Sequence, residues 1–294
     1  MENKHNKFLK ITICIFIIVI LLSCFTLLYS RYIATSNIKI NEYKITNNKI
    51  PNNFHGLKIV HITDIHYGRI TKNKELNELS KKINLTNPDI VVLTGDLIDK
   101  DTDLTSKMIN ELTDFLNSIE VRIGKYAIKG DHDVNFDNWD IIIENSGFIN
   151  LNDSYDKIYD NDSINNIFLA GISTNLKSDK KIEEKVSIIN DYFNDNSEDN
   201  KSNYNILLIH EPDYIDKFDY SKFDLILAGH SLNGQIRLPI IGAMIKPNGA
   251  KKYYDPYYKL NNTDLYISSG IGVSDNNFRL FNKPSFNLYR LTNY

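Results

Sequence analysis

Apolar positions divide this chain into one long apolar segment near the N-terminus and a series of short apolar runs. Five of the short runs are rich in β-branched residues and bounded by polar residues or glycine, and this pattern predicts buried strands. The runs cover residues 57–63, 90–94, 126–129, 206–209 and 225–228. Residues 37–50 instead alternate apolar and polar side chains, which predicts a strand at the edge of a sheet.

Apolar residues with helical spacing lie between the predicted strands. They predict helices over residues 72–87, 102–118, 137–144 and 180–193, and a polar, solvated loop over residues 194–203. Helices alternate with strands early in the chain and strands dominate later, so we expect an α/β fold of two packed sheets flanked by helices. There is no internal repeat, and about 240 residues beyond the long apolar segment suit one domain.

The long apolar segment covers residues 11–29 and carries no charged side chain. Its length matches what one helix needs to cross a bilayer. Lys4, Lys7 and Lys10 precede it, and Arg31 follows it. The positive-inside rule then predicts a cytoplasmic N-terminus and an extracytoplasmic domain. We therefore divide the chain into a cytoplasmic segment (residues 1–10), a transmembrane anchor (residues 11–30) and one domain (residues 36–294), and expect a single-pass protein of the cell membrane.

Two alternatives to an uncleaved anchor stay open. A cleaved signal peptide has a shorter apolar region and a small-residue cleavage site, and the segment shows neither. Leu21-Leu22-Ser23-Cys24 loosely resembles the lipobox of a lipoprotein, but apolar residues 25–29 follow it where a polar linker is usual. Either alternative still places the domain outside and near a membrane.

Composition narrows the chemistry of the domain. Both cysteines, Cys14 and Cys24, lie in the apolar segment, so the domain has neither a disulfide nor a sulfur ligand for a metal. The formal charge of the chain is −3, and no cluster of Lys and Arg lies among the polar motifs. We therefore expect no nucleic-acid partner.

Candidate metal ligands follow the predicted strands directly. Asp64 and His66 come after the first run, Asp96 after the second, and His210 and His230 after the last two. In sheets of this kind, ligands gather at the carboxyl ends of the strands. Two divalent ions about 3.5–4 Å apart need a bridging carboxylate with oxygen and nitrogen ligands on each side. Asp96 suits the bridge. Asp64 and His66, two residues apart on one extended segment, can hold one ion, and the two later histidines can hold the other.

The order of these motifs resembles that of the calcineurin-like metallophosphoesterases. The family pattern is D-x-H, G-D-x-x-D, G-N-H-[DE], a lone His and G-H-x-H, and this chain follows it from residue 57 onward. Its last motif, GHSLNGQ at residues 229–235, is similar to the G-H-[TS]-H-G-G-Q of a small bacterial membrane-associated branch. The resemblance implies a four-layer α/β sandwich (αββα), two divalent metal ions and hydrolysis of phosphoester bonds.

The resemblance also implies a role for each matching residue. One metal would be held by Asp64, His66 and the bridging Asp96, and the other by Asp96, Asp131, His210 and His230. His132 would protonate the leaving-group oxygen or stabilise its charge, and Asp99 would orient the His132 imidazole.

Two departures from the family pattern bear on the metals. Asp131 replaces the family's Asn, and Leu232 replaces its last His. Leucine cannot bind a metal, so the ion at Asp64 and His66 loses one ligand, while the other ion gains a negative oxygen. We infer a harder site that favours manganese, with magnesium, iron or zinc as alternatives, and that binds the first ion weakly. Asn233 is a substitute ligand in principle, although a role in the turn that follows suits it better.

Four other polar residues are interpreted as structural. His61, inside the first run, and His55, just before it, are expected to be packing or surface residues. Asp133 is expected to accept hydrogen bonds within the fold. Arg279 is expected at the surface, with a contact to phosphate as the alternative.

The apolar segment at residues 236–246 follows the last motif directly. It allows two interpretations: a hairpin that contacts lipid or an acyl chain, or side chains (Leu238, Ile240, Ile241 and Met244) that pack on the sheet. The sequence as a whole predicts an outward-facing metal-dependent phosphodiesterase or phosphatase that acts on a phosphorylated lipid or envelope precursor. The alternative function, raised by Leu232, is a catalytically degenerate binding module on the same fold.

Overall fold

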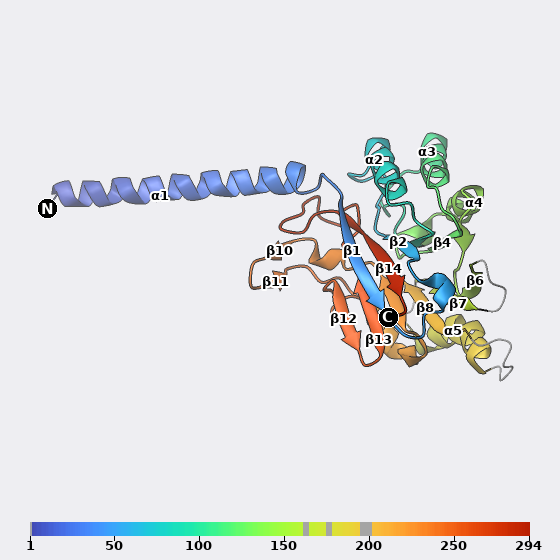
Figure 1. Ribbon diagram of the computed structural model, residues 1–294. Helices are drawn as coiled ribbons and strands as arrows, with labels where there is room; N and C mark the ends of the chain where they lie inside the picture. The colour runs from blue at the N-terminus through green and yellow to red at the C-terminus, as the bar shows by residue number, and fades with distance from the viewer. Residues whose placement is uncertain (1, 161–164, 175–177, 195–201) are drawn as a thin grey trace.

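Two six-stranded sheets form the centre of the domain (Figure 1). The computed structural model describes residues 2–160, 165–174, 178–194 and 202–294. The first sheet has, in spatial order, β1 (Lys39–Thr46), β14 (Ser285–Thr292), β2 (Lys58–Ile62), β3 (Ile90–Thr94), β4 (Gly124–Ile128) and β5 (Ile149–Asn150). The second has β12 (Tyr257–Leu260), β13 (Thr263–Ile267), β9 (Leu225–Ala228), β8 (Tyr204–Ile209), β7 (Asn166–Ile172) and β6 (Ser154–Tyr159). A separate hairpin pairs β10 (Arg237–Leu238) with β11 (Gly242–Ala243).

Helices cover the outer faces of both sheets, which makes four layers. The helices α2 (Asn73–Asn84), α3 (Ser106–Asn117) and α4 (Asn138–Asn145) pack on the first sheet, and α5 (Asp179–Asn194) packs on the second. Successive side chains of a strand point to opposite faces, so Val91 and Leu93 of β3 join the helix-facing core while Ile90 and Val92 join the core between the sheets. The central strands are thus apolar on both faces, as parallel strands buried in an α/β fold are.

The predicted elements agree with this architecture. The five apolar runs form β2, β3, β4, β8 and β9, and residues 37–50 contain the edge strand β1, which pairs in parallel with β14. The four predicted helices are α2 to α5, with ends shifted by one to four residues. The four-layer α/β prediction is confirmed. Most of the loop predicted over residues 194–203 lies outside the described residues.

The N-terminal apolar segment forms the long helix α1 (Glu2–Leu28), which continues into a π-helical turn at Tyr29–Ile33 and projects away from the domain (Figure 1). Residues Asn6–Ile33 make one helix that is long and apolar enough to cross a membrane. The backbone N–H of Arg279 donates to the carbonyl of Ser30 (3.0 Å), so a loop of the domain meets the chain directly where α1 ends.

The strand directions bring the ligand-bearing loops together. The strands β2, β3 and β4 run parallel in the first sheet, and β7, β8 and β9 run parallel in the second. Their carboxyl ends approach closely: a Cβ on Gly95 would lie 2.5 Å from the backbone nitrogen of Gly130 and 2.7 Å from Nδ1 of His210. Glycine at this point lets loops from both sheets meet at one site.

Candidate metal centre

Asp64, His66 and Asp96 form the first group of candidate ligands. Nε2 of His66 lies 3.8 Å from Oδ1 of Asp64 and 3.7 Å from Oδ2 of Asp96, and all three side chains are buried. Asp64 and His66 do not lie on the extended backbone predicted from the sequence: their φ angles are +50° and +47°. The loop after β2 instead turns through the left-handed region while its N–H groups bond the loop after β3, from Asp64 to Gly95 and from His66 to Asp96.

A second group gathers around Asp96 from the other side. Nε2 of His210 lies 3.3 Å from Oδ2 of Asp96 and 3.1 Å from Oδ1 of Asp131. Nδ1 of His230 lies 3.0 Å from the same Asp131 oxygen. Asp96, Asp131, His210 and His230 thus offer one ligand atom each within 4.8 Å of one another. Because Asp96 belongs to both groups, it lies where a bridging carboxylate would.

Backbone carbonyls orient the imidazoles toward these groups. Nδ1 of His210 lies 2.6 Å from the carbonyl oxygen of Thr94, and Nε2 of His230 lies 2.7 Å from that of Asn248. A carbonyl only accepts, so each of these ring nitrogens carries a proton. The other nitrogen of each ring faces the carboxylates, where its lone pair would bind a metal ion. Both nitrogens of His66 are buried without a hydrogen-bond partner among the described residues. An unpartnered buried nitrogen beside two carboxylates fits a metal ligand.

His132 and Asp99 lie beside the first group. Oδ2 of Asp99 lies 3.6 Å from Nδ1 of His132 and 3.5 Å from Nδ1 of His66. The backbone N–H of Lys100 donates to Nδ1 of His132 (3.1 Å), a contact that the sequence did not reveal because a backbone donor leaves no signature in residue type. Accepting that bond puts the proton of the neutral His132 ring on Nε2.

The carboxylates set the charge of the imidazoles. Burial lowers the pKa of His210, but the charge of Asp96 and hydrogen bonds with Asp131 and Asp96 outweigh burial and hold the pKa of His210 well above its usual value. Burial likewise raises the pKa of Asp131, but hydrogen bonds with His210 and His230 outweigh it and lower that pKa. A divalent cation among these groups would compete with protons on the imidazoles, so metal binding is coupled to proton release.

Four of the candidate ligands have a strained backbone. Besides Asp64 and His66, Asp96 (φ +53°) and His230 (φ +64°) adopt left-handed backbone conformations, which are rare outside glycine. Such residues persist where the surrounding structure holds them, and they gather at functional sites.

Leu232 lies beside the first ligand group. It is buried, and a Cβ on Gly270 would lie 2.9 Å from Cδ2 of Leu232 and 2.6 Å from Cβ of Asp64. The position where the family pattern has its last His therefore borders Asp64 but offers no ligand atom. Asn233 does not replace it: Nδ2 of Asn233 donates to the carbonyl of Ile267 (3.3 Å), and the residue lies in the turn at Leu232–Gly234, as preferred from the sequence.

The two ligand groups open into a cleft of about 330 Å³. Several of its other lining residues were not predicted from the sequence because they lie outside the motifs: Lys100, Glu211, Tyr214, Asn248, Ser274, Asp275 and Asn276. Nζ of Lys100 and Oδ1 of Asp275 form an ion pair (2.6 Å) that joins the loop after β3 to the loop before β14.

Arg279 is not at the surface, as the sequence suggested, but fully buried. Its Nε donates to the carbonyl of Gly272 (2.9 Å), and its Nη2 donates to Ser269 (2.7 Å), Gly270 (3.1 Å) and Gly272 (2.6 Å). Burial lowers the pKa of Arg279 to about 9, although the charge of Asp64 opposes that shift. The guanidinium supplies donors to the backbone carbonyls of an irregular, buried loop.

The other structural assignments are confirmed. His61 is buried and its Nε2 lies 2.7 Å from Oγ1 of Thr94, while His55 is exposed. The Asp133 carboxylate accepts from the backbone N–H groups of Gly130 (3.0 Å) and Ile98 (3.1 Å).

The hairpin β10–β11 exposes apolar side chains. Ile240, Ile241 and Met244 have exposed fractions of 107%, 71% and 52%, and Leu238 is half-buried. The interpretation in which these residues pack on the sheet is therefore wrong for Ile240, Ile241 and Met244.

Comparison with known proteins finds related sequences and structures. The family model of the calcineurin-like phosphoesterases matches residues 57–234. The uncharacterized metallophosphoesterase YkuE of Bacillus subtilis is 28% identical over 266 residues, which cover 90% of this chain and 88% of that protein. The UDP-2,3-diacylglucosamine pyrophosphatase LpxG of Chlamydia trachomatis is 27% identical, with 71% and 74% covered. Among solved structures, a dimetal phosphatase from Danio rerio is 12% identical with a TM-score of 0.42, covering 74% of this chain and 88% of that one.

Proposed function

Because the chain belongs to the calcineurin-like phosphoesterase family, we propose that it is a dinuclear-metal-dependent hydrolase of phosphoester bonds that acts at the outer surface of a membrane. The observation that carries the proposal is the pair of Asp and His groups that share Asp96 at the meeting point of the two sheets. Neither group alone is specific, because acidic clusters are common. Two groups joined by one carboxylate match the needs of a two-metal site.

The ligand atoms present suit two divalent cations. Asp64, His66 and Asp96 would hold one, and Asp96, Asp131, His210 and His230 would hold the other. Bound there, two divalent ions supply Lewis acidity toward a phosphoryl oxygen and lower the pKa of water. We propose manganese, or a similarly hard ion, because carboxylate oxygens are numerous and Leu232 removes one imidazole.

His132 is the proposed general acid. In the neutral ring the Lys100 N–H donates to Nδ1, and the Nε2–H can stabilise the charge of a leaving-group oxygen by a hydrogen bond. In the protonated ring Asp99 lies close to Nδ1 and balances the positive charge, and Nε2 can deliver its proton to that oxygen. Burial lowers the pKa of His132, but Asp99, Asp96 and Asp131 outweigh burial, and the pKa is raised. A raised pKa keeps the ring able to deliver a proton at neutral pH.

Three features support a lipid-linked substrate. The helix α1 is long and apolar enough to anchor the domain at a bilayer, and the tip of the hairpin β10–β11 exposes Ile240 and Ile241. The related LpxG is named for its action on UDP-2,3-diacylglucosamine, a molecule with acyl groups and a pyrophosphate. The proposed substrate is therefore a phosphoester or pyrophosphate attached to a lipid, held with its phosphate at the metals and its acyl part against the hairpin.

A binding module without catalysis is the second candidate, and the buried Leu232 favours it. The test uses the full chain in detergent, stripped of metal and titrated with manganese, magnesium and zinc, with an aryl phosphodiester and an aryl phosphomonoester as substrates. Metal-dependent turnover that falls about 10²- to 10⁴-fold in His132→Ala would support the hydrolase. His55→Ala, an exposed histidine away from the site, is the matched control.

The variant Leu232→His separates the two functions. If the natural chain is inert with every metal and Leu232→His gains turnover, catalysis has been lost and the binding module is correct. If the natural chain turns over substrate, Leu232→His should lower the manganese concentration needed for half-maximal activity, because it adds a fourth ligand beside Asp64.

A further inference from the structure

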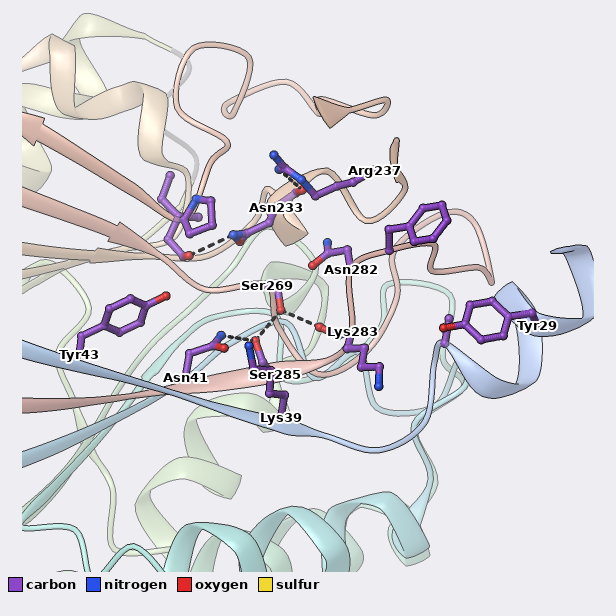
Figure 2. A pocket seen from close by; sticks show the side chains of 14 residues that line it. Tyr29, Lys39, Asn41, Tyr43, Asn233, Arg237, Ser269, Asn282, Lys283 and Ser285 are labelled. Atoms are coloured by element: carbon purple, nitrogen blue, oxygen red, sulfur yellow. Dashed lines mark hydrogen bonds between the residues drawn. The ribbon is translucent and has the colours of Figure 1, made fainter. Parts of the chain in front are cut away.

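A second cavity, of about 420 Å³, lies where α1 meets the domain (Figure 2). It lies on the other side of the Leu232–Gly234 turn from the metal cleft, because Asn233 lines this cavity while Ser231 and Leu232 line the cleft. Tyr29 borders it at the end of α1, and Lys39 and Asn41 border it from β1. None of the proposed metal ligands reaches it, so it is a separate site.

The cavity is positively charged. Lys39, Arg237 and Lys283 line it, and no Asp or Glu is among its described lining residues. Arg237 is paired with Asp255 (2.7 Å), but Lys39 and Lys283 are exposed and their side chains form no ion pair or hydrogen bond within the described part of the chain. Figure 2 shows both lysines on the same side of the cavity, below Ser269. Two unneutralised ammonium groups at one opening favour an anionic ligand.

The wall of the cavity holds a buried acceptor without a partner. Asn233 is 4% exposed, its Nδ2 donates to the carbonyl of Ile267, and its Oδ1 meets no hydrogen-bond donor among the described residues. The neighbouring polar groups are satisfied: Nδ2 of Asn41 donates to Oγ of Ser285 (2.9 Å), and that hydroxyl lies 2.7 Å from Oγ of Ser269. A buried acceptor without a hydrogen bond costs free energy, so a ligand with a hydrogen-bond donor is favoured beside Oδ1 of Asn233.

The remaining edge of the cavity is apolar and lies toward α1. Phe281 is 65% exposed, and Tyr29 lies in the helical turn that continues α1 (Figure 2). The bond from the Arg279 N–H to the Ser30 carbonyl holds this loop against the end of that helix. A ligand whose anionic group binds the two lysines could therefore extend an apolar part along the surface of α1.

We propose that this cavity binds the headgroup of an anionic phospholipid from the bilayer that α1 enters, with the phosphate at Lys39 and Lys283 and a headgroup hydroxyl donating to Oδ1 of Asn233. The proposal rests on the membrane anchoring in the proposed function and not on hydrolysis. Phosphatidylglycerol combines one negative phosphate with free hydroxyls and is the probe of choice.

The test measures lipid bound to the full, metal-free chain in detergent micelles by native mass spectrometry, so loss of hydrolysis cannot affect it. Lys39→Glu/Lys283→Glu should bind phosphatidylglycerol at least about 30-fold more weakly, because each basic residue near anionic lipid contributes roughly a factor of five. The matched control is Lys44→Glu/Lys81→Glu, two exposed lysines outside the cavity, with the same change in net charge. An equal loss in the control would overturn the proposal, because net charge alone would then explain binding.

Two further arms identify the ligand. Phosphatidylmethanol, which has the same charge but no headgroup hydroxyl, should bind more weakly than phosphatidylglycerol, and equal affinity would overturn the contact with Asn233. Inorganic phosphate and glycerol 3-phosphate should not displace the lipid at millimolar concentration. If instead they bind the natural chain and not the double variant, while the lipid binds neither, the ligand is a soluble phosphate and the lipid assignment is wrong.

Discussion

The exposed tip of the hairpin β10–β11 gives the sharpest test of a lipid-linked substrate. Ile241 is 71% exposed beside the fully exposed Ile240, on the segment that follows the last motif. Ile241→Asp puts a charge where we expect an acyl chain or the bilayer surface. The hairpin forms only four residues of strand, so the substitution leaves the cores of both sheets untouched.

The size of the effect follows from the exposed area. Complete burial of an isoleucine side chain contributes about 1.5–3 kcal/mol, so burying the exposed part of Ile241 against lipid contributes about 1–2 kcal/mol. The variant should therefore raise KM for a lipid phosphoester roughly 5- to 30-fold. The expected kcat and KM for a soluble aryl phosphoester are unchanged, because the metal ligands lie elsewhere.

The assay compares the full chain in vesicles that contain the lipid substrate with the same vesicles and a soluble substrate. Ile188→Asp is the control, since Ile188 is 51% exposed on α5, which lies on the side of the domain away from α1 (Figure 1). An unchanged KM for the lipid would refute the contact. Equal losses on both substrates would show that the hairpin supports the cleft and does not hold an acyl chain.

Three further predictions concern stability and metal binding. Burial lowers the pKa of His61 to about 3, so the imidazole stays neutral in the folded chain at a pH where it is protonated in the unfolded chain, below about pH 6.5. Stability from this group is complete above that pH and falls toward pH 3. Between pH 7 and pH 5 the unfolding free energy, measured with guanidinium, should therefore fall by about 2 kcal/mol less in His61→Gln than in the natural chain. An equal fall in the two proteins would contradict this role of His61. Gly130→Ala should weaken manganese binding roughly tenfold in calorimetry, because a Cβ there would lie 2.9 Å from Cγ of Asp96; unchanged affinity would count against the position of that carboxylate. Arg279→Lys should lower the unfolding free energy by about 1–3 kcal/mol, because an ammonium cannot reproduce the planar donors that pair with the carbonyls of Ser269 and Gly272; a stability equal to that of the natural chain would refute this role.

The local pattern of apolar and polar residues was sufficient to predict most of the fold. The strands β2, β3 and β9 are short apolar runs whose neighbours are polar or glycine, and burial on both faces leaves such a run little alternative to a central strand. Helix ends were less well predicted. The helix α3 begins at Ser106, four residues after the predicted start, because the hydroxyl of Thr105 accepts from the Met108 N–H and caps it there.

The candidate site was likewise predicted only in part from the sequence. Asp64, His66, Asp96, Asp131, His210 and His230 were all named from motif order, and the structure brings them together. The conformation that does so was not predicted. Asp64 and His66 were expected on extended backbone, yet both are left-handed, because the loop after β2 must follow the loop after β3.

The sequence by itself therefore determined the elements, their order, the types of ligand and the apolar segment at the N-terminus. Each of these depends on residues that are close together in the chain, where spacing and side-chain chemistry act directly. Tertiary structure alone decided that Arg279 is buried, that Lys100 holds His132, that Ile240 and Ile241 are exposed, and that a second cavity forms beside α1. These features depend on which distant segments meet, and neither residue type nor spacing along the chain carries that information.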